Sequence, residues 1–258
     1  MPGKFKRLPR LEGLIARRVL LNYRADPTVV ERLIPAPLEV VRRNGSAVVG
    51  VCLIRIEGLR PLGVPAVFGL SSESQAHRVA IRYPTTDGPK EGVFVWRRDT
   101  NSRATQLTGG RLFPGVHGPA RFQVLDDGRE LRMRTFTANT AADIAFEARS
   151  FDAFRPTRLF NSVAEASAFF QQGECGLSCS HAGRIEGVRL HIADWSITPL
   201  GVDSVHASFF EDSDNFPRGS VEFDCGLLMR GVRHEWSEWV PGAFHAMNKL
   251  GDTNAKIA

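Results

Sequence analysis

The sequence predicts an α+β fold built on a large, curved antiparallel sheet or β-barrel that encloses a cavity, with a few short helices. Strand-like runs outnumber helical ones along the 258 residues, and many are joined across short turns such as Asn44-Gly45, a strong local hairpin signal. Strands and helices do not alternate as in βαβ units, which disfavours a doubly wound parallel sheet. No repeat or linker interrupts the pattern, so a single domain over residues 1–258 is expected.

The first elements along the chain are a strand, a short helix and a hairpin. An apolar run over 14–25 predicts the strand. Asp26 is placed to cap a helix whose first position is Pro27 and which ends before Pro35. Residues 38–56 then supply two strand-like runs on either side of the hairpin turn already mentioned.

A loop rich in glycine and proline follows over 58–71, with apolar residues between the turn formers. This composition predicts an ordered loop that packs over a neighbour, as a lid does. Residues 73–99 predict a second hairpin around Asp87-Gly88.

The middle of the chain predicts a helix, a hairpin and a strand. The helix is expected over 100–110, with Thr100 or Asn101 as its N-cap and a double glycine at its end. The hairpin is expected over 120–138 around an Asp-Gly turn, and the strand over 143–151.

The last third begins with a short helix over 162–173, in which Ser162 and Glu165 form a capping box and Gly173 closes the end. The elements expected after it are strands over 176–181, 185–192, 203–211 and 220–229, and a C-terminal helix over 234–250 that is broken near Pro241.

Charge and composition exclude several classes of partner. The formal charge is +5, but basic residues are scattered rather than gathered in one segment, as a nucleic-acid surface requires. No glycine-rich phosphate loop precedes a helix, and the aromatic residues form no stacking platform. We therefore expect no nucleic-acid partner and no cofactor.

The expected location is the cytoplasm, with no membrane partner. No apolar run approaches the roughly 20 residues of a membrane span, and the basic start has no apolar segment behind it. The four cysteines are too sparse for a disulfide framework, and a reducing compartment suits them.

Cys175, Cys179 and His181 fall on one face of an expected strand, which raises the question of a metal site. Tetrahedral sites usually draw ligands from tight turns and need a fourth partner, and no second cluster is present. Small cysteines that pack a sheet are the favoured interpretation, and no metal is expected.

Candidate ligand-binding residues lie on the strand that follows the predicted lid. Period-two alternation places His77 on one face and Arg78 and Arg82 on the other. Arginine suits a bidentate clamp on a carboxylate, although a row of arginines on a solvent-exposed face is the common alternative. Either face fits the cavity at this point.

Four segments, in order, resemble the acetoacetate decarboxylase family, and especially its uncharacterised DUF2071 relatives. They are NYRADPTVVERLIPAPLEV, ESQAHRV, GGRLFPGVHGP and VEFDCGLLMRGVRHEW. The resemblance spans nearly the whole chain and implies that family's fold, a small oxo-acid or related carboxylate ligand, and a homo-oligomer.

The same resemblance implies that the family's Schiff-base chemistry is lost. Its two lysines align with Gly118 and Pro119, and the nearest lysine in the sequence is Lys90. One of the family's acidic residues matches Glu73, and its active-site arginine falls beside Arg17.

Glu73 and His117 are the candidate catalytic residues, because a carboxylate near an imidazole serves general acid–base chemistry. Arg17, His77, Arg78, Arg82, Arg111 and Gly118 are the candidate substrate-binding residues. Two interpretations stay open: a cofactor-independent lyase, isomerase or hydratase, and a non-catalytic small-molecule binding protein. A strand-end charge at Glu73, a turn cap at His117 and a structural ion pair at Arg111 are the corresponding non-functional explanations.

Overall fold

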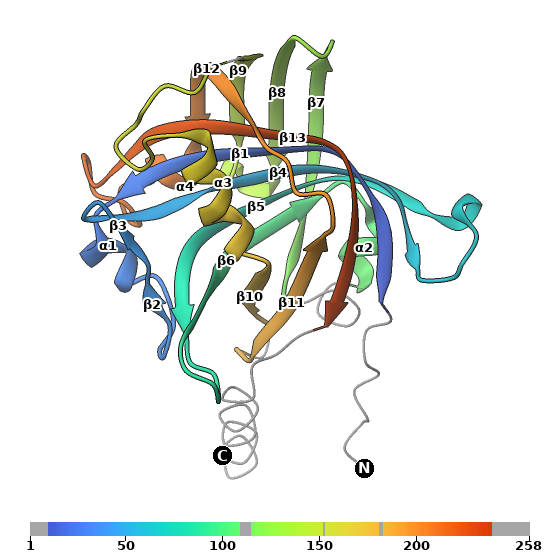
Figure 1. Cartoon of the computed structure of the whole chain (residues 1–258), viewed down its shortest axis with the longest axis horizontal. Helices are drawn as coiled ribbons and strands as arrows, with labels where there is room; N and C mark the ends of the chain where they lie inside the picture. Colours follow the sequence, from blue (N-terminus) through green and yellow to red (C-terminus); the bar gives the residue numbers. More distant parts are fainter. Residues whose placement is uncertain (1–9, 109–114, 152, 181–182, 239–258) are drawn as a thin grey trace.

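The computed structural model describes residues 10–108, 115–151, 153–180 and 183–238, and strands dominate them (Figure 1). The strands are β1 Leu11–Ala25, β2 Glu39–Val40, β3 Arg42–Arg43, β4 Ser46–Pro61, β5 Leu70–Tyr83, β6 Lys90–Thr100, β7 His117–Asp126, β8 Glu130–Thr137, β9 Ile144–Ser150, β10 Cys175–Cys179, β11 Ile185–Ile192, β12 Thr198–Ala207 and β13 Val221–Glu238. The helices are α1 Pro27–Glu31, α2 Arg103–Thr108, α3 Val163–Gln172 and α4 Ser208–Glu211, with short 3-10 turns η1 Ala66–Phe68 and η2 Ala138–Thr140.

The strand pairings close on themselves in two rings that share one wall. The wall consists of β13, β1, β4, β5 and β6, hydrogen-bonded in that order. The larger ring is completed by β7, β8, β9 and β12, and the smaller ring by β10 and β11. The large curved sheet predicted from the sequence is therefore confirmed.

Two ladders depart from the antiparallel expectation, because β6 pairs in parallel with both β10 and β7. Its first half, at Val93 and Phe94, pairs with β10, and its end, from Arg98, pairs with β7. The sheet is therefore mixed, and the rings diverge along β6.

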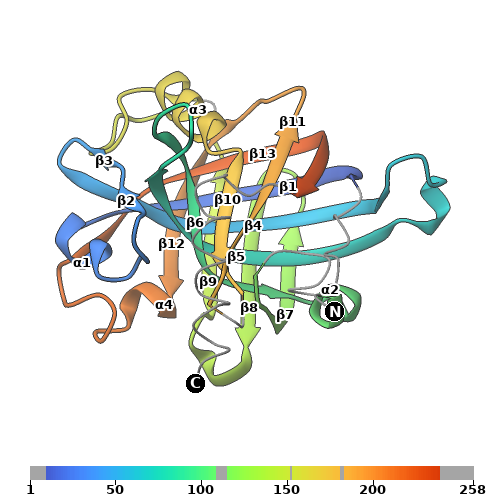
Figure 2. The ribbon, with the colours of Figure 1, turned by 90° about the horizontal axis from the view of Figure 1, so that it is seen from below.

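Each face of the wall carries its own hydrophobic core. On one face, Val51 and Val79 belong to a cluster that includes Met133 of β8 and Phe146 of β9. On the other, Leu20 belongs to a cluster with Phe170 of α3. Figure 2 shows α3 on one side of the wall and β7 to β9 on the other. We call these faces the α3 side and the β8 side.

The helix caps follow the chemistry read from the sequence. The side chain of Asp26 accepts a hydrogen bond from the Thr28 N–H at 2.8 Å, as an N-cap should. Ser162 caps α3 in the same way through the Glu165 N–H at 3.1 Å. For α2, the expected caps at Thr100 and Asn101 are wrong: the Ser102 side chain accepts from the Thr105 N–H.

The expected C-terminal helix is wrong over residues 234–238, which continue β13. Gly231 adopts a positive φ of 65°, and beyond it the strand still pairs with β1 and β11. The rest of that helix lies outside the described residues. The strand expected over 203–211 ends at Ala207, where α4 begins.

Residues 58–71 do not form a lid. β4 and β5 continue beyond the wall and join through η1, forming an arm that projects from the molecule (Figure 1). Its apolar tip is solvent-exposed, with 82% of Val67 and 70% of Phe68 accessible. The arm therefore covers no other element that the structure describes.

None of the helices in the described ranges combines the length and the hydropathy that a membrane crossing demands.

Candidate ligand site

Two strands of the shared wall each carry a pair of adjacent arginines. These pairs are Arg17-Arg18 on β1 and Arg97-Arg98 on β6. Neighbouring residues of a strand point to opposite faces. Each pair therefore sends one guanidinium to the β8 side and one to the α3 side. The two sides differ in how these charges are balanced.

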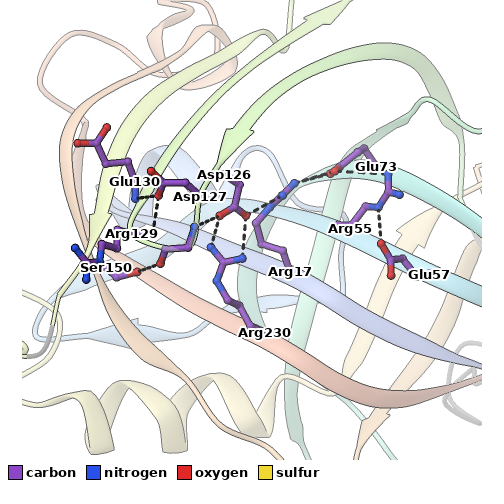
Figure 3. Close-up of polar contacts among 11 residues, drawn as sticks. Arg17, Arg55, Glu57, Glu73, Asp126, Asp127, Arg129, Glu130, Ser150 and Arg230 are labelled. Carbon is purple, nitrogen blue, oxygen red and sulfur yellow. Dashed lines mark hydrogen bonds and ion pairs between the residues drawn. The ribbon is translucent and has the colours of Figure 1, made fainter.

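On the β8 side the arginines are paired with carboxylates (Figure 3). Arg17 Nη2 donates to both carboxylate oxygens of Glu73 at 2.8 and 2.9 Å, and its Nη1 donates to Asp126 at 3.2 Å. Arg230 binds Asp126 through both terminal nitrogens at 2.7 and 2.8 Å. Arg55 Nη1 lies 3.9 Å from Glu73. This network ties together β1, β4, β5, β7 and β13.

Asp126 is held ionised by this network. Burial raises the pKa of its carboxyl, but hydrogen bonds from Arg230 and the Gly128 N–H outweigh burial, so the pKa lies below its ordinary value. Glu73 is buried and bound by a bidentate arginine, an arrangement that holds a structural ion pair.

Glu73 and His117 are not brought together. Glu73 shares its face of β5 with Gln75, which bonds to Asp99 on the β8 side. His117 begins β7 and pairs with Arg98, whose side chain lies on the other face of β6. The structure thus separates the two candidate catalytic residues by the thickness of the sheet.

His77 belongs to the core of the β8 side. Its side chain is fully buried, and its ring centroid lies 4.7 Å from that of Phe209. Burial, reinforced by the charge of Arg97, lowers its pKa to about 3. The ring is therefore neutral and packs within the hydrophobic core of the β8 side.

On the α3 side, Arg18 and Arg98 are separated by two small residues, Cys52 on β4 and Ala76 on β5. Ala76 is the direct cross-strand neighbour of both Cys52 and Arg98. Arg18 Nε donates to Cys52 Sγ at 3.3 Å. Ala76, Arg18 and Arg98 are each partly exposed, so solvent reaches this face of the wall.

Arg98 forms no hydrogen bond with any residue inside the described ranges. A Cβ built on Gly115 would lie 2.6 Å from both Arg98 Nη1 and Ser178 Oγ, which places those two polar groups together. Burial lowers the pKa of Arg98 to about 10 and the charge of Glu186 opposes that shift. The guanidinium therefore remains protonated at neutral pH.

Gly115 allows this approach because it has no side chain. Its φ is +80°, and its N–H donates to Glu186 Oε2 at 3.0 Å. Two residues on, His117 lies beside Arg98, and burial together with that charge lowers its pKa to about 4. The imidazole is therefore neutral at neutral pH.

Arg78 is the third arginine on the α3 side. It is buried, its Nη2 donates to Asn22 Oδ1 at 2.8 Å, and its guanidinium lies 4.9 Å from the ring centroid of Phe170. Burial lowers its pKa to about 10. Gly50 separates Arg78 from Asn22 in the ladder, and its missing side chain lets Arg78 reach across β4.

The other expected ligand residues are not part of this cluster. Arg82 is exposed and pairs with Glu91 at 3.3 Å. A Cβ on Gly118 would lie 2.4 Å from Asp99 Oδ1, so no side chain fits at that position. Arg17 is committed to its ion pairs, and Arg111 lies outside the described residues.

Sequence reasoning missed Arg18, Arg98 and Ser178. The signal for the arginines was available as the doubled arginine on β1 and β6, because alternation gives each pair one member per face. Ser178 reaches the cluster through the pairing of β10 with β6, which local sequence does not encode.

No group of three or more potential metal ligands comes together among the residues that the structure describes. Cys175 is buried, Cys179 is partly buried, and both thiols are free. His181, the third member of the sequence cluster, lies outside the described ranges.

Comparison with known proteins identifies the scaffold. A model of the DUF2071 family, described as an uncharacterized conserved protein, matches residues 15–214. No curated protein matches the sequence.

Several solved structures share the fold. Acetoacetate decarboxylase from Legionella pneumophila has a TM-score of 0.56 at 13% identity, over 94% of each chain. An acetoacetate decarboxylase-like enzyme from Sphingomonas wittichii RW1 has a TM-score of 0.56 at 14% identity, over 93% of this chain and 97% of that one. The enduracididine biosynthesis enzyme MppR, complexed with pyruvate, has a TM-score of 0.52 at 12% identity, over 92% and 90%.

Proposed function

The chain belongs to the DUF2071 family of uncharacterized conserved proteins, and on that premise we propose that it binds a small oxo acid or related carboxylate on the α3 side of the wall. The observation that carries the proposal is the charge imbalance there. Arg18, Arg78 and Arg98 form no ion pair at contact distance with any described carboxylate, whereas Arg17 and Arg97 on the β8 side both do.

A carboxylate ligand supplies what the cluster lacks. A guanidinium taken from water without an acceptor is costly, and a carboxylate satisfies it through two parallel hydrogen bonds. Ser178 Oγ, buried beside Arg98 and without a partner inside the described ranges, offers a further donor. That MppR is complexed with pyruvate on the same scaffold supports a ligand of this size.

Chemistry at this site would not use a Schiff base. Lys90, the lysine that falls within the described ranges, is exposed at the first residue of β6, at the far end of that strand from Arg98. His117 is the proton-transfer group beside Arg98, and its neutral ring can accept a proton from a bound acid. A lyase, isomerase or hydratase reaction fits this group.

A non-catalytic binding protein is the second candidate. It is favoured by the separation of Glu73 from His117, because the two expected catalytic groups lie on opposite faces of the sheet. The low pKa of His117 also makes it a weak base.

The test is calorimetric titration of pyruvate and acetoacetate into the wild type, Arg98→Gln and the matched control Arg97→Gln. Arg98→Gln should weaken binding at least tenfold, because a charge-assisted hydrogen bond contributes about 1.5–3 kcal/mol. Arg97→Gln removes the same charge from the neighbouring residue, whose side chain lies on the β8 side. Glu73→Gln changes a second residue on the β8 side. Once folding is verified by circular dichroism, both of these control variants should bind the ligand with an affinity within about threefold of the wild type.

Equal weakening by both arginine variants would overturn the site. Turnover is then followed by NMR of the bound ligand, in the wild type and in His117→Gln. Chemical change that depends on His117 supports an enzyme, and an unchanged ligand supports the binding protein.

A further inference from the structure

A cleft opens at the edge of the shared wall, where β12 separates from β13. The two strands are paired over Thr198 to Leu200, and from there β12 follows β9 (Figure 1). The loop after β9 forms the third side of the cleft. The cleft has a volume of about 360 Å³, which lies in the range of roughly 300–1,000 Å³ that small-ligand pockets occupy. Its lining includes Phe151, Phe154, Arg155, Val202, Phe223 and Cys225.

Two irregular features of β13 shape this cleft. Asp224 is the extra residue of a β-bulge in the pairing of β13 with β1, and a bulge bends its strand. A Cβ on Gly226 would lie 2.6 Å from Val202 Cγ2, so Val202 lies directly against the backbone of β13. The strands are therefore in contact at one end of the cleft, and β13 bends at the other.

The walls of the cleft are largely apolar. Phe151 is 41% exposed. Phe154 and Phe223 are partly buried, and they pack against the cores of the α3 side and the β8 side, respectively. Burial and the charge of Asp224 raise the pKa of Cys225 to about 12, so this thiol is neutral. Three aromatic rings and a neutral thiol therefore allow an apolar group to leave water.

One charged group of the cleft lacks a partner of opposite charge. Arg155 lies over Phe151, with its guanidinium carbon 5.4 Å from the ring centroid, and it forms no hydrogen bond or ion pair in the parts of the chain that the structure describes. The acidic residues of the cleft are engaged. Asp203 accepts from Arg149 Nε at 3.0 Å, and Asp224 Oδ1 accepts from two backbone N–H groups of the neighbouring loop at 3.0 and 3.2 Å. The charge that complements this cleft is therefore negative.

We propose that the cleft binds a small apolar carboxylate, such as an aryl-substituted acetate, at a site separate from the arginine cluster of the α3 side. Arg155 pairs with the carboxylate through two N–H donors, and the apolar group lies against the phenylalanine rings. A carboxylate without an apolar group gains only an exposed ion pair, which contributes little in water. An apolar amine places a second cation beside Arg155. The ligand therefore carries both an apolar group and a negative charge.

The test is calorimetric titration of phenylacetate into the wild type, Arg155→Gln and the matched control Arg158→Gln. Arg158 is an exposed arginine of the same loop that does not line the cleft. Arg155→Gln should weaken binding about tenfold, the usual effect of losing a charge-assisted hydrogen bond. Arg158→Gln should stay within about twofold of the wild type, because an exposed charge outside the contact contributes little. Acetate and phenethylamine should each bind the wild type at least about tenfold more weakly than phenylacetate.

The apolar half of the site is tested by Phe151→Ser, with Phe136→Ser as its control. Both variants remove an aromatic ring that is partly accessible to solvent, but Phe136 lies on β8, away from the cleft. Phe151→Ser should weaken phenylacetate about tenfold, because the ligand loses an apolar wall. Phe136→Ser should bind phenylacetate as the wild type does.

Arg98→Gln separates this site from the proposed oxo-acid site, because it should leave the affinity for phenylacetate unchanged. Photolabelling of the wild type with 4-azidophenylacetate, followed by peptide mass spectrometry, should mark the loop around Phe154 or the adjoining segments of β12 and β13. Equal losses in Arg155→Gln and Arg158→Gln, or a wild type that does not bind phenylacetate, would overturn the proposal. Loss of binding in Arg98→Gln, with labelling on the α3 side, would also overturn the cleft as the site and leave the proposed function standing.

Discussion

Arg97 and Arg98 show how far the surroundings of one residue differ from those of the next. Arg97 donates to both carboxylate oxygens of Asp99 at 3.0 Å. Arg98 lies beside Gly115 and the Ser178 hydroxyl, within electrostatic reach of Glu186. Arg97 therefore has a contacting carboxylate, whereas Arg98 has none among the residues that the structure describes.

His77 should make the protein sensitive to acid. Its pKa falls from the ordinary 6.5 to about 3 on folding, so the folded state binds fewer protons between those values. The free energy of unfolding is therefore complete above about pH 6.5 and falls as pH drops toward 3, by up to about 1.4 kcal/mol per pH unit for one histidine. His117 and His234, both with a pKa of about 4, act in the same direction.

We expect His77→Leu to lose less stability than wild type between pH 7 and pH 5, as measured by urea unfolding at each pH. Identical pH slopes for His77→Leu and wild type would show that His77 is not the titrating group.

At the residue scale the sequence indicates which side chains share a face but not what each face meets. Alternation on β5 grouped Gln75 with His77 and separated both from Arg78, and the structure confirms that grouping. The alternation could not show that His77 packs against Phe209, because Phe209 belongs to a segment distant in the sequence. The pairing of Glu73 with His117 failed for the same reason.

Gly50 illustrates a constraint at the scale of elements. β4 runs between β1 and β5, and at this position the three strands approach closely enough for Arg78 to bond Asn22. A Cβ on Gly50 would lie 2.4 Å from the Leu21 carbonyl oxygen. The Leu21 carbonyl belongs to the backbone of β1, so it cannot move aside for the added methyl group as the end of a flexible side chain would.

Gly50→Ala should therefore destabilise the protein by about 2 kcal/mol, the usual cost of overpacking, and lower its Tm by roughly 4–8 °C. Gly176→Ala is the matched control, since it is also a strand glycine but its Cβ would meet nothing closer than 3.7 Å. Thermal unfolding by circular dichroism compares the two. A Gly50→Ala protein as stable as Gly176→Ala would contradict this account.

The sequence predicted strands, turns and helices correctly where the residues of the segment itself determine its structure. Asn44-Gly45 and Asp127-Gly128 do turn between antiparallel strands, because glycine adopts the positive φ there. The prediction failed where pairing with distant strands determines the structure of a segment. Residues 234–238 alternate in period two, yet it is their pairing with β1 and β11 that makes them a strand.

The arm is the feature of the whole molecule that the monomer leaves unexplained. Leu62, Val67, Phe68 and Leu70 expose large apolar side chains at its tip. Arg60 braces the arm through hydrogen bonds to the carbonyls of Val64 and Gly58. A braced, exposed apolar surface of this kind is typical of an interface.

The family resemblance implies a homo-oligomer, and we expect the arm to form its interface. The double variant Val67→Ser, Phe68→Ser should elute as a smaller species in size-exclusion chromatography with light scattering, with an unchanged Tm. Leu125→Ser is the control, because Leu125 is 69% exposed on β7, away from the arm. A wild type that is monomeric at high concentration would refute this expectation.

The shared wall also restricts how the chain length can vary. When one residue is inserted into or deleted from a strand, every later side chain of that strand moves to the opposite face of the sheet. Within β5 a single deletion would carry Glu73 away from Arg17 or Arg78 away from Asn22, and both rings would lose their contacts at once. Substitutions can adapt each ring separately, but insertions and deletions cannot. The arm, where β4 and β5 leave the wall, is the place where this pair of strands tolerates a change in length.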